Sequence, residues 1–209
     1  MARSARRALP DGLHHVTSRT VRGLPLFVTE GDARAFLSLI DCVTREYAAW
    51  RMLAYCLMPN HVHFVVDAKI AELSVAMHRV NGLYAQRFNR THGCRGHLFQ
   101  GRFHAKPILD GGHLPESVRY VLLNPVRAGL CTRPEHWRWS SYRASIGLTP
   151  SPHFLSGDQL ASALGTSPAD VERVLREFVD AALPARQQPA TVPGTVPADP
   201  ARATAYPRP

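Results

Sequence analysis

Hydrophobic residues recur along this chain at two different spacings, and the change from one spacing to the other predicts the order of its elements. Between residues 30 and 48, apolar residues stand three or four positions apart, as they do on the buried face of a helix. Residues 72–90 repeat this spacing and predict a second, longer amphipathic helix. Its apolar stripe consists of Leu73, Met77, Val80, Tyr84 and Phe88.

Segments rich in β-branched and aromatic residues predict strands between these helices. They cover residues 13–22, 50–57, 61–66 and 97–108. Met58-Pro59-Asn60 is a typical turn sequence, so we expect the second and third strands to form a hairpin. A third helix is predicted over residues 114–124 and should end before Pro125, because the residue preceding proline disfavours the helical region.

The predicted order is strand, helix, strand, strand, helix, strand, helix. This order favours an α+β fold of ferredoxin-like type, with an antiparallel sheet and helices packed mainly on one of its faces. The other face would then be partly open. The sequence shows no internal repeat.

The chain divides into four predicted parts. Residues 1–11 form a basic arm, residues 12–150 the main domain, and residues 151–183 a C-terminal helical extension. Residues 184–209 are rich in Pro, Ala and Thr and should be disordered. The text around residues 159–180 resembles a helix-turn-helix, but its second helix carries more acidic than basic side chains, which suits a packed extension better than a DNA groove.

The charge of the chain points to a polyanionic partner. The 209 residues include 25 Lys and Arg against 16 Asp and Glu, which gives a formal charge of +9. Residues 73–109 contain no Asp or Glu, and their interleaved aromatic side chains are suited to stacking on unpaired bases. A solvated helix face is the alternative. The candidate DNA-binding residues are Arg3, Arg6 and Arg7 in the arm, and Arg79, Arg87, Arg90, Arg95, Arg102 and Lys106 in the acid-free stretch.

Other classes of protein fit the sequence poorly. The four cysteines are widely spaced and form no C-x-x-C pair, which is typical of reduced thiols. No apolar run follows the N-terminal arginines as in a signal peptide, and none approaches the ~20 residues of a membrane span. We therefore expect a soluble cytoplasmic protein, associated with the nucleoid through its DNA.

Two short motifs carry candidate chemistry. In Asn60-His61-Val62-His63 the two histidines alternate along a strand, so they share one face and can act as paired metal ligands. Tyr120 and Asn124 stand four residues apart on the third helix, away from its apolar face, and so also share a face. Each motif has an ordinary structural explanation. Together they predict a metal site beside a tyrosine nucleophile, which suits phosphodiester cleavage.

Five blocks of the sequence resemble the REP-associated tyrosine transposases, within the single-tyrosine HUH nuclease superfamily. They cover roughly residues 12–145 in the order that this family has. The matching text is HHVTSRT at 14–20, AYCLMPNHVHFVV at 54–66, GHLFQGRF at 96–103, RYVLLNPVRAGL at 119–130 and WRWSSYR at 137–143. Thr20 replaces the glycine that is more usual after Ser-Arg.

The resemblance implies a role for each matching residue. His61, His63 and Asn124 would hold one divalent cation, Mg²⁺ or Mn²⁺, and Tyr120 would be the nucleophile. The substrate would be single-stranded DNA that folds into a hairpin of the repetitive extragenic palindrome type. Cleavage would pass through a 5′-phosphotyrosine intermediate and would allow rejoining.

Three questions stay open at this stage. A domesticated relative would bind hairpin nucleic acid without cutting it, and a metalloenzyme for small molecules would also use an H-x-H pair. The basic charge disfavours the second alternative. The sequence is compatible with a monomer or a dimer.

Overall fold

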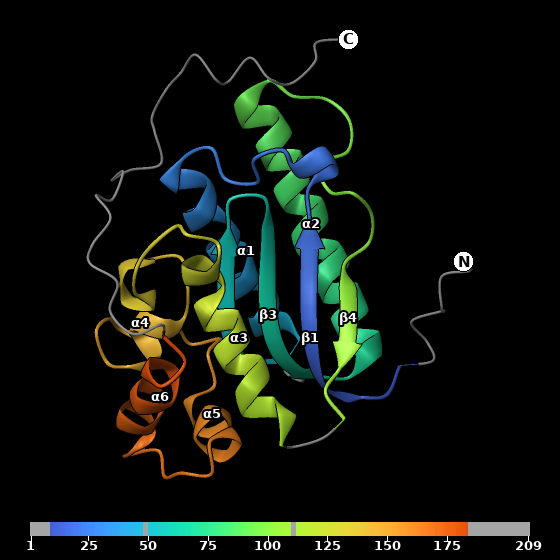
Figure 1. Cartoon of the computed structure of the whole chain (residues 1–209). Helices are drawn as coiled ribbons and strands as arrows, with labels where there is room; N and C mark the ends of the chain where they lie inside the picture. The colour runs from blue at the N-terminus through green and yellow to red at the C-terminus, as the bar shows by residue number, and fades with distance from the viewer. Residues whose placement is uncertain (1–8, 48–49, 110–111, 184–209) are drawn as a thin grey trace.

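The computed structural model describes residues 9–47, 50–109 and 112–183. The predicted DNA-binding residues Arg3, Arg6 and Arg7 and the predicted disordered tail at 184–209 lie outside the described residues. Figure 1 shows a central sheet with helices in front of it and behind it.

The sheet is antiparallel, and its described strands follow the order β2-β3-β1-β4. The strands are β1 (Gly12–Arg19), β2 (Arg51–Met58), β3 (His61–Ala68) and β4 (His104–Pro107). The hairpin predicted around Pro59 is formed by β2 and β3. The predicted α+β fold with an antiparallel sheet is therefore confirmed.

Strand β4 is shorter than the strand predicted over residues 97–108. Only its last part pairs regularly with β1, while Phe99 makes a single bridge to Thr20. Gly96, which has a positive φ of 87°, and Gly101 flank the irregular part. Glycine weakens a strand because it has no side chain to pack, so the ladder begins only at His104.

Helices α1 (Glu30–Glu46) and α2 (Ile70–His92) cover one face of the sheet. Phe36 and Ile40 of α1 and Val80 of α2 pack against Phe64 and Val66 of β3 in a buried core. A capping box fixes the start of α1: Thr29 accepts a hydrogen bond from the Asp32 amide, and Asp32 accepts one from the Thr29 amide. His92 at the end of α2 contacts the same carboxylate at 3.0 Å, which joins the two helices.

Helix α3 (His113–Arg127) lies on the opposite face and packs over β2 and β3. Val118, Val121 and Leu122 are buried there against Cys56 of β2 and Val65 of β3. This is the packed face of the helix that the sequence predicted. The helix leaves β1 and β4 open on this side (Figure 1).

The prediction that this helix ends before Pro125 is wrong, because Pro125 lies inside α3. Proline costs the helix one amide donor, but the hydrogen bonds that follow it are made. The Ala128 amide donates to the Asn124 carbonyl at 2.9 Å, and the Leu130 amide donates to the Pro125 carbonyl at 2.9 Å. Pro125 is itself buried, which holds the last turn in place.

The C-terminal helices complete the layer around α3. After the short η3 (Pro134–His136) and α4 (Tyr142–Ser145) come α5 (Gly157–Ala163) and α6 (Val171–Asp180). Leu160 of α5 and Leu175 and Val179 of α6 join the core beneath α3. Both α5 and α6 lie within residues 151–183, where the sequence predicted helices.

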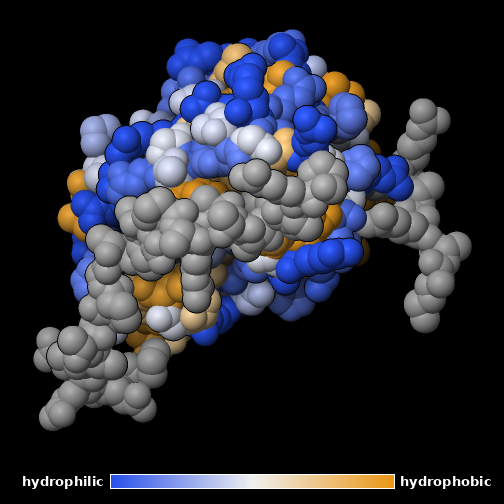
Figure 2. Space-filling view, turned by 90° about the horizontal axis from the view of Figure 1, so that it is seen from above, coloured by the Kyte–Doolittle hydropathy of each residue, from blue (hydrophilic) through white to orange (hydrophobic). Residues whose placement is uncertain are grey.

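The surface seen from the end with the β2–β3 turn is largely hydrophilic, with apolar side chains showing in the middle and at the lower left of the view (Figure 2).

In the described part of the chain, no helix combines the length and the apolar character that a membrane span needs.

Truncating the packed face of α3 should destabilise the protein. Leu122 is 1% exposed, so Leu122→Ala should lower the free energy of unfolding by about 2–5 kcal/mol through lost burial and a residual cavity. Leu148→Ala, at a leucine that is 48% exposed, should change it by no more than about 0.5 kcal/mol. Urea unfolding followed by circular dichroism measures both, and equal effects would contradict the assigned packing.

Candidate functional site

The strand register brings a set of polar side chains to the sheet face that carries α3. Residues paired across antiparallel strands share a face, and β1 pairs Thr17 with His63 and Arg19 with His61. His15 lies two residues before Thr17 and therefore faces the same side. The predicted histidine pair thus stands beside the open part of the sheet.

Tyr120 of α3 lies directly against these histidines. Its ring centroid is 6.0 Å from that of His63 and 5.7 Å from that of His15, in edge-on contacts. The side chain is 43% exposed, and the guanidinium of Arg127 lies 5.0 Å from its ring centroid. The structure therefore brings the predicted nucleophile against His63 of the predicted metal-binding pair, with the tyrosine open to solvent.

Asn124 is held one helical turn beyond Tyr120. Its side-chain amide donates to the Tyr120 carbonyl at 2.8 Å, which leaves the amide oxygen as its remaining polar atom. Helix α3 runs toward the end of the sheet with the β2–β3 turn, where His61 begins β3 (Figure 1). Asn124 therefore lies on the His61 side of Tyr120.

Both histidines of the pair use the same ring nitrogen for contacts within the protein. Nδ1 of His61 lies 2.6 Å from Oδ1 of Asn60, and Nδ1 of His63 lies 2.8 Å from Nε2 of His15. The Nε2 atoms are therefore the ones left for an external ligand. Metal-binding histidines commonly show this arrangement, in which the second ring nitrogen is held by a neighbour.

The surroundings keep these imidazoles neutral. Burial, reinforced by the charge of Arg19, lowers the pKa of His61 to about 4. Burial, with further contributions from His61, His15 and Arg19, lowers the pKa of His63 to about 3. Burial also lowers the pKa of His15, and His104 and Lys106 add to the effect. Neutral imidazole is the protonation state that a metal ligand needs, and both histidines of the pair have it at neutral pH.

The two histidines supply part of the donor set that a divalent cation would need. Among the described residues, no group of three His, Cys, Asp or Glu side chains is placed to hold a metal ion. A third protein ligand, if the site holds a cation, would be a side chain of another type. The amide oxygen of Asn124 is the donor that the sequence analysis named, and oxygen suits Mg²⁺ and Mn²⁺.

His15 is the residue of this site that sequence reasoning missed. It stands in the HHVTSRT block, but two adjacent histidines on a strand point to opposite faces, and the sequence does not say which one faces the site. Alternation shows that His15, Thr17 and Arg19 share a side. Only the pairing of β1 with β3 shows that this side is the one with His63.

The predicted DNA-binding residues do not form one surface. Arg79 and Arg87 lie on α2, on the far side of the sheet, where Arg79 pairs with Glu46 of α1. Lys106 lies on β4 opposite His15, on the open face beside Tyr120. The others are exposed around the end of α2 and the loop before β4: Arg90, Arg95 and Arg102.

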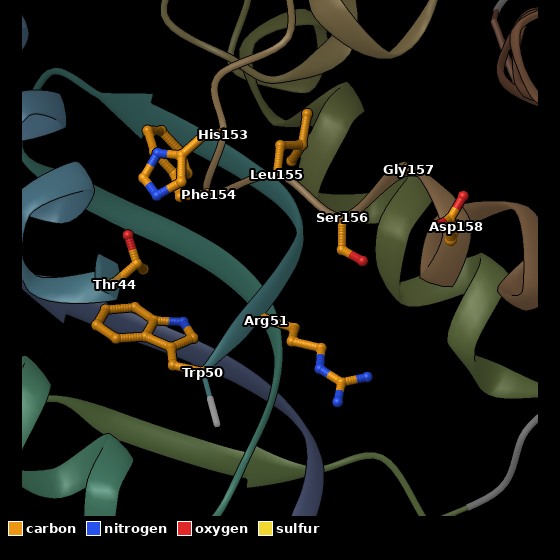
Figure 3. A pocket seen from close by; sticks show the side chains of 9 residues that line it. All are labelled: Thr44, Trp50, Arg51, His153, Phe154, Leu155, Ser156, Gly157 and Asp158. Atoms are coloured by element: carbon orange, nitrogen blue, oxygen red, sulfur yellow. The ribbon is translucent and has the colours of Figure 1, made fainter. Parts of the chain in front are cut away.

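A pocket of about 410 Å³ lies away from these residues, at the start of β2 (Figure 3). It is lined by Trp50, Arg51, Phe154 and neighbouring side chains. In the β2–β3 ladder Arg51 lies across from Asp67, which is near the end of β3, whereas His61 begins that strand. The cavity is thus separate from the site of Tyr120.

Comparisons with known proteins agree with this fold. One solved structure, described as a REP-associated tyrosine transposase bound to a REP hairpin, matches with a TM-score of 0.58 and 20% identity. The match covers 72% of this chain and 89% of the other. No curated protein matches the chain. The family model described as "Transposase IS200 like" matches residues 13–121, more than half of the chain. The protein therefore belongs to the IS200-like transposase family.

Proposed function

We propose that this protein binds hairpin-forming single-stranded DNA and cuts and rejoins it by transesterification through Tyr120. The observation that carries the proposal is the contact of a half-exposed tyrosine ring with His63 and His15 at the edge of an open sheet face. The solved relative that is bound to a REP hairpin supports hairpin DNA as the substrate class.

We propose positions for the side chains around the scissile phosphate from the donors described above. Nε2 of His61, Nε2 of His63 and the amide oxygen of Asn124 would hold one Mg²⁺ or Mn²⁺ ion. When bound, such a cation withdraws negative charge from a phosphate oxygen. The three side chains would orient the phosphate toward Tyr120, and burial keeps the histidines neutral for this role.

The reaction itself exchanges one phosphodiester for another. The Tyr120 hydroxyl oxygen attacks phosphorus, the bond from phosphorus to the 3′ oxygen breaks, and the hydroxyl proton is lost to a base. The products are a 5′-phosphotyrosine and a strand that ends in a 3′-hydroxyl, which has taken up a proton. Attack of a 3′-hydroxyl on the phosphotyrosine reverses the steps, so rejoining needs no ATP. Lys106, on the same face, is our candidate for the base.

The open part of the sheet provides a path for the DNA strand next to Tyr120. The residues of β1 and β4 on this face are Leu13, His15, Thr17, Arg19, His104 and Lys106, none of them acidic. Arg19 stands opposite His61 and is exposed, with no ion pair to another described residue. A phosphate that approaches the histidines would therefore meet an unpaired guanidinium.

The first experiment tests covalent attachment. Protein is mixed with labelled oligonucleotides that carry the palindromes flanking its gene, with Mn²⁺ or with chelator, and is run on a denaturing gel. Tyr120→Phe should still bind the hairpin but form no adduct, because the attacking hydroxyl is gone. Tyr47→Phe, at the end of α1, is the matched control and should form the adduct normally. An adduct in Tyr120→Phe would refute the assignment, and binding without any adduct in the native protein would favour a non-cleaving hairpin-binding protein.

A second test separates metal binding from DNA binding. His63→Ala should reduce the cleavage rate by on the order of 100-fold or more, since charge stabilisation by a metal is worth several kcal/mol. Hairpin affinity, measured by fluorescence anisotropy, should change much less. His136→Ala, at an exposed histidine outside the site, serves as the control. Cleavage by the native protein at its normal rate in chelator would contradict the metal site.

A third test examines the open face. Arg19→Gln should weaken binding to all hairpins and reduce the salt dependence of log K by about 1, as expected when one phosphate contact is lost. Arg34→Gln on α1, which lies across the sheet, should leave both quantities unchanged. If log K depended equally on salt concentration in the native protein and in Arg19→Gln, Arg19 would not contact a phosphate of the bound DNA.

A further inference from the structure

His15 and His63 meet in a specific geometry. Nε2 of His15 lies 2.8 Å from Nδ1 of His63, the ring centroids are 5.1 Å apart, and the ring planes are inclined by 19°. The two imidazoles therefore meet edge to edge in nearly one plane. This is the geometry of an in-plane N–H···N hydrogen bond, in which one nitrogen carries the proton and the other accepts it.

The direction of this hydrogen bond decides whether His63 can be a ligand. If Nδ1 of His63 is the donor, its Nε2 carries a lone pair and can bind a cation. If Nε2 of His15 is the donor, a neutral His63 carries its proton on Nε2 and cannot bind there. One hydrogen bond thus switches His63 between a ligating and a non-ligating tautomer.

The neighbouring histidine supports the first of these directions. Nδ1 of His61 lies 2.6 Å from the Oδ1 atom of Asn60, which can only accept, so the proton of His61 is on Nδ1. Nδ1 of His63 is engaged in the same way by His15. A matching proton position would present Nε2 of both rings as acceptors.

We propose that His15 is a positioning residue that accepts the Nδ1 proton of His63 and so fixes the tautomer and ring orientation required of a metal ligand. The inference rests on the proposed metal site. His15 touches no reacting atom and acts through His63, while its other contact, with the Tyr120 ring, places the nucleophile beside the same ring.

The first part of the experiment uses the metal-free native protein. Imidazole ¹⁵N chemical shifts of His63 at neutral pH report which nitrogen carries the proton. We expect Nδ1 to be protonated and Nε2 to be free. A proton on Nε2 of His63 would overturn the proposal. This measurement requires no variant and does not depend on DNA cleavage.

The second part compares variants by titration with Mn²⁺. His15→Phe keeps a ring against Tyr120 but removes the hydrogen-bond acceptor. It should raise the Mn²⁺ dissociation constant by about 10–100-fold, the usual effect of losing such a partner. His15→Gln supplies an amide oxygen and should recover much of the loss. His136→Phe is the matched control and should bind as the native protein does. Circular dichroism establishes that each variant is folded.

The outcomes separate this inference from the proposed function. Unchanged Mn²⁺ affinity in a folded His15→Phe would overturn the role of His15 while leaving the metal site intact. A His15→Gln variant as weak as His15→Phe would mean that His15 acts through packing and not as an acceptor, which also overturns it. If the native protein binds no Mn²⁺, the proposed metal site fails, and the role assigned to His15 fails with it.

Discussion

The pairing register of β1 with β3 is the constraint on which the candidate site depends. It sets Arg19 opposite His61 and Thr17 opposite His63, and it brings His15 to the edge of the His63 ring. Because side chains alternate along a strand, a slip of β1 by one residue would turn Arg19, Thr17 and His15 toward α1 and α2, away from His61 and His63. The core prevents that slip, since Val16 of β1 is fully buried on the other face together with Phe64.

Much of this arrangement could be predicted from the sequence because it follows from local periodicity. Alternation placed His61 and His63 on one face, and helical phase separated Tyr120 and Asn124 from Val118, Val121 and Leu122. The structure confirms the first pattern by the contact of the His61 and His63 rings, whose centroids are 4.7 Å apart, and the second by the burial of the three apolar residues. The roles assigned to these residues remain predictions, since their proximity does not by itself establish chemistry.

What the sequence did not reveal depends on contacts between distant segments. The position of His15 requires the pairing of β1 with β3, and the length of β4 depends on where the ladder with β1 breaks down. Pro125 was misjudged because tertiary burial outweighs the local preference of proline. The acid-free stretch suggested one DNA-binding surface because it is continuous in sequence. In the fold, however, the sheet separates Arg79 and Arg87 from Lys106.

The contacts of Arg119 have a consequence for how this fold can diverge. Its guanidinium lies 4.2 Å from the Phe178 ring centroid and donates to the Phe178 carbonyl at 3.3 Å, which fastens α3 to α6 just beside Tyr120. Phe178 lies well beyond residue 121, where the family match ends. The backbone that carries the tyrosine is thus anchored by a part of the chain outside the matched region. Sequence changes in that extension can therefore shift the position of Tyr120 while every matched motif stays unchanged.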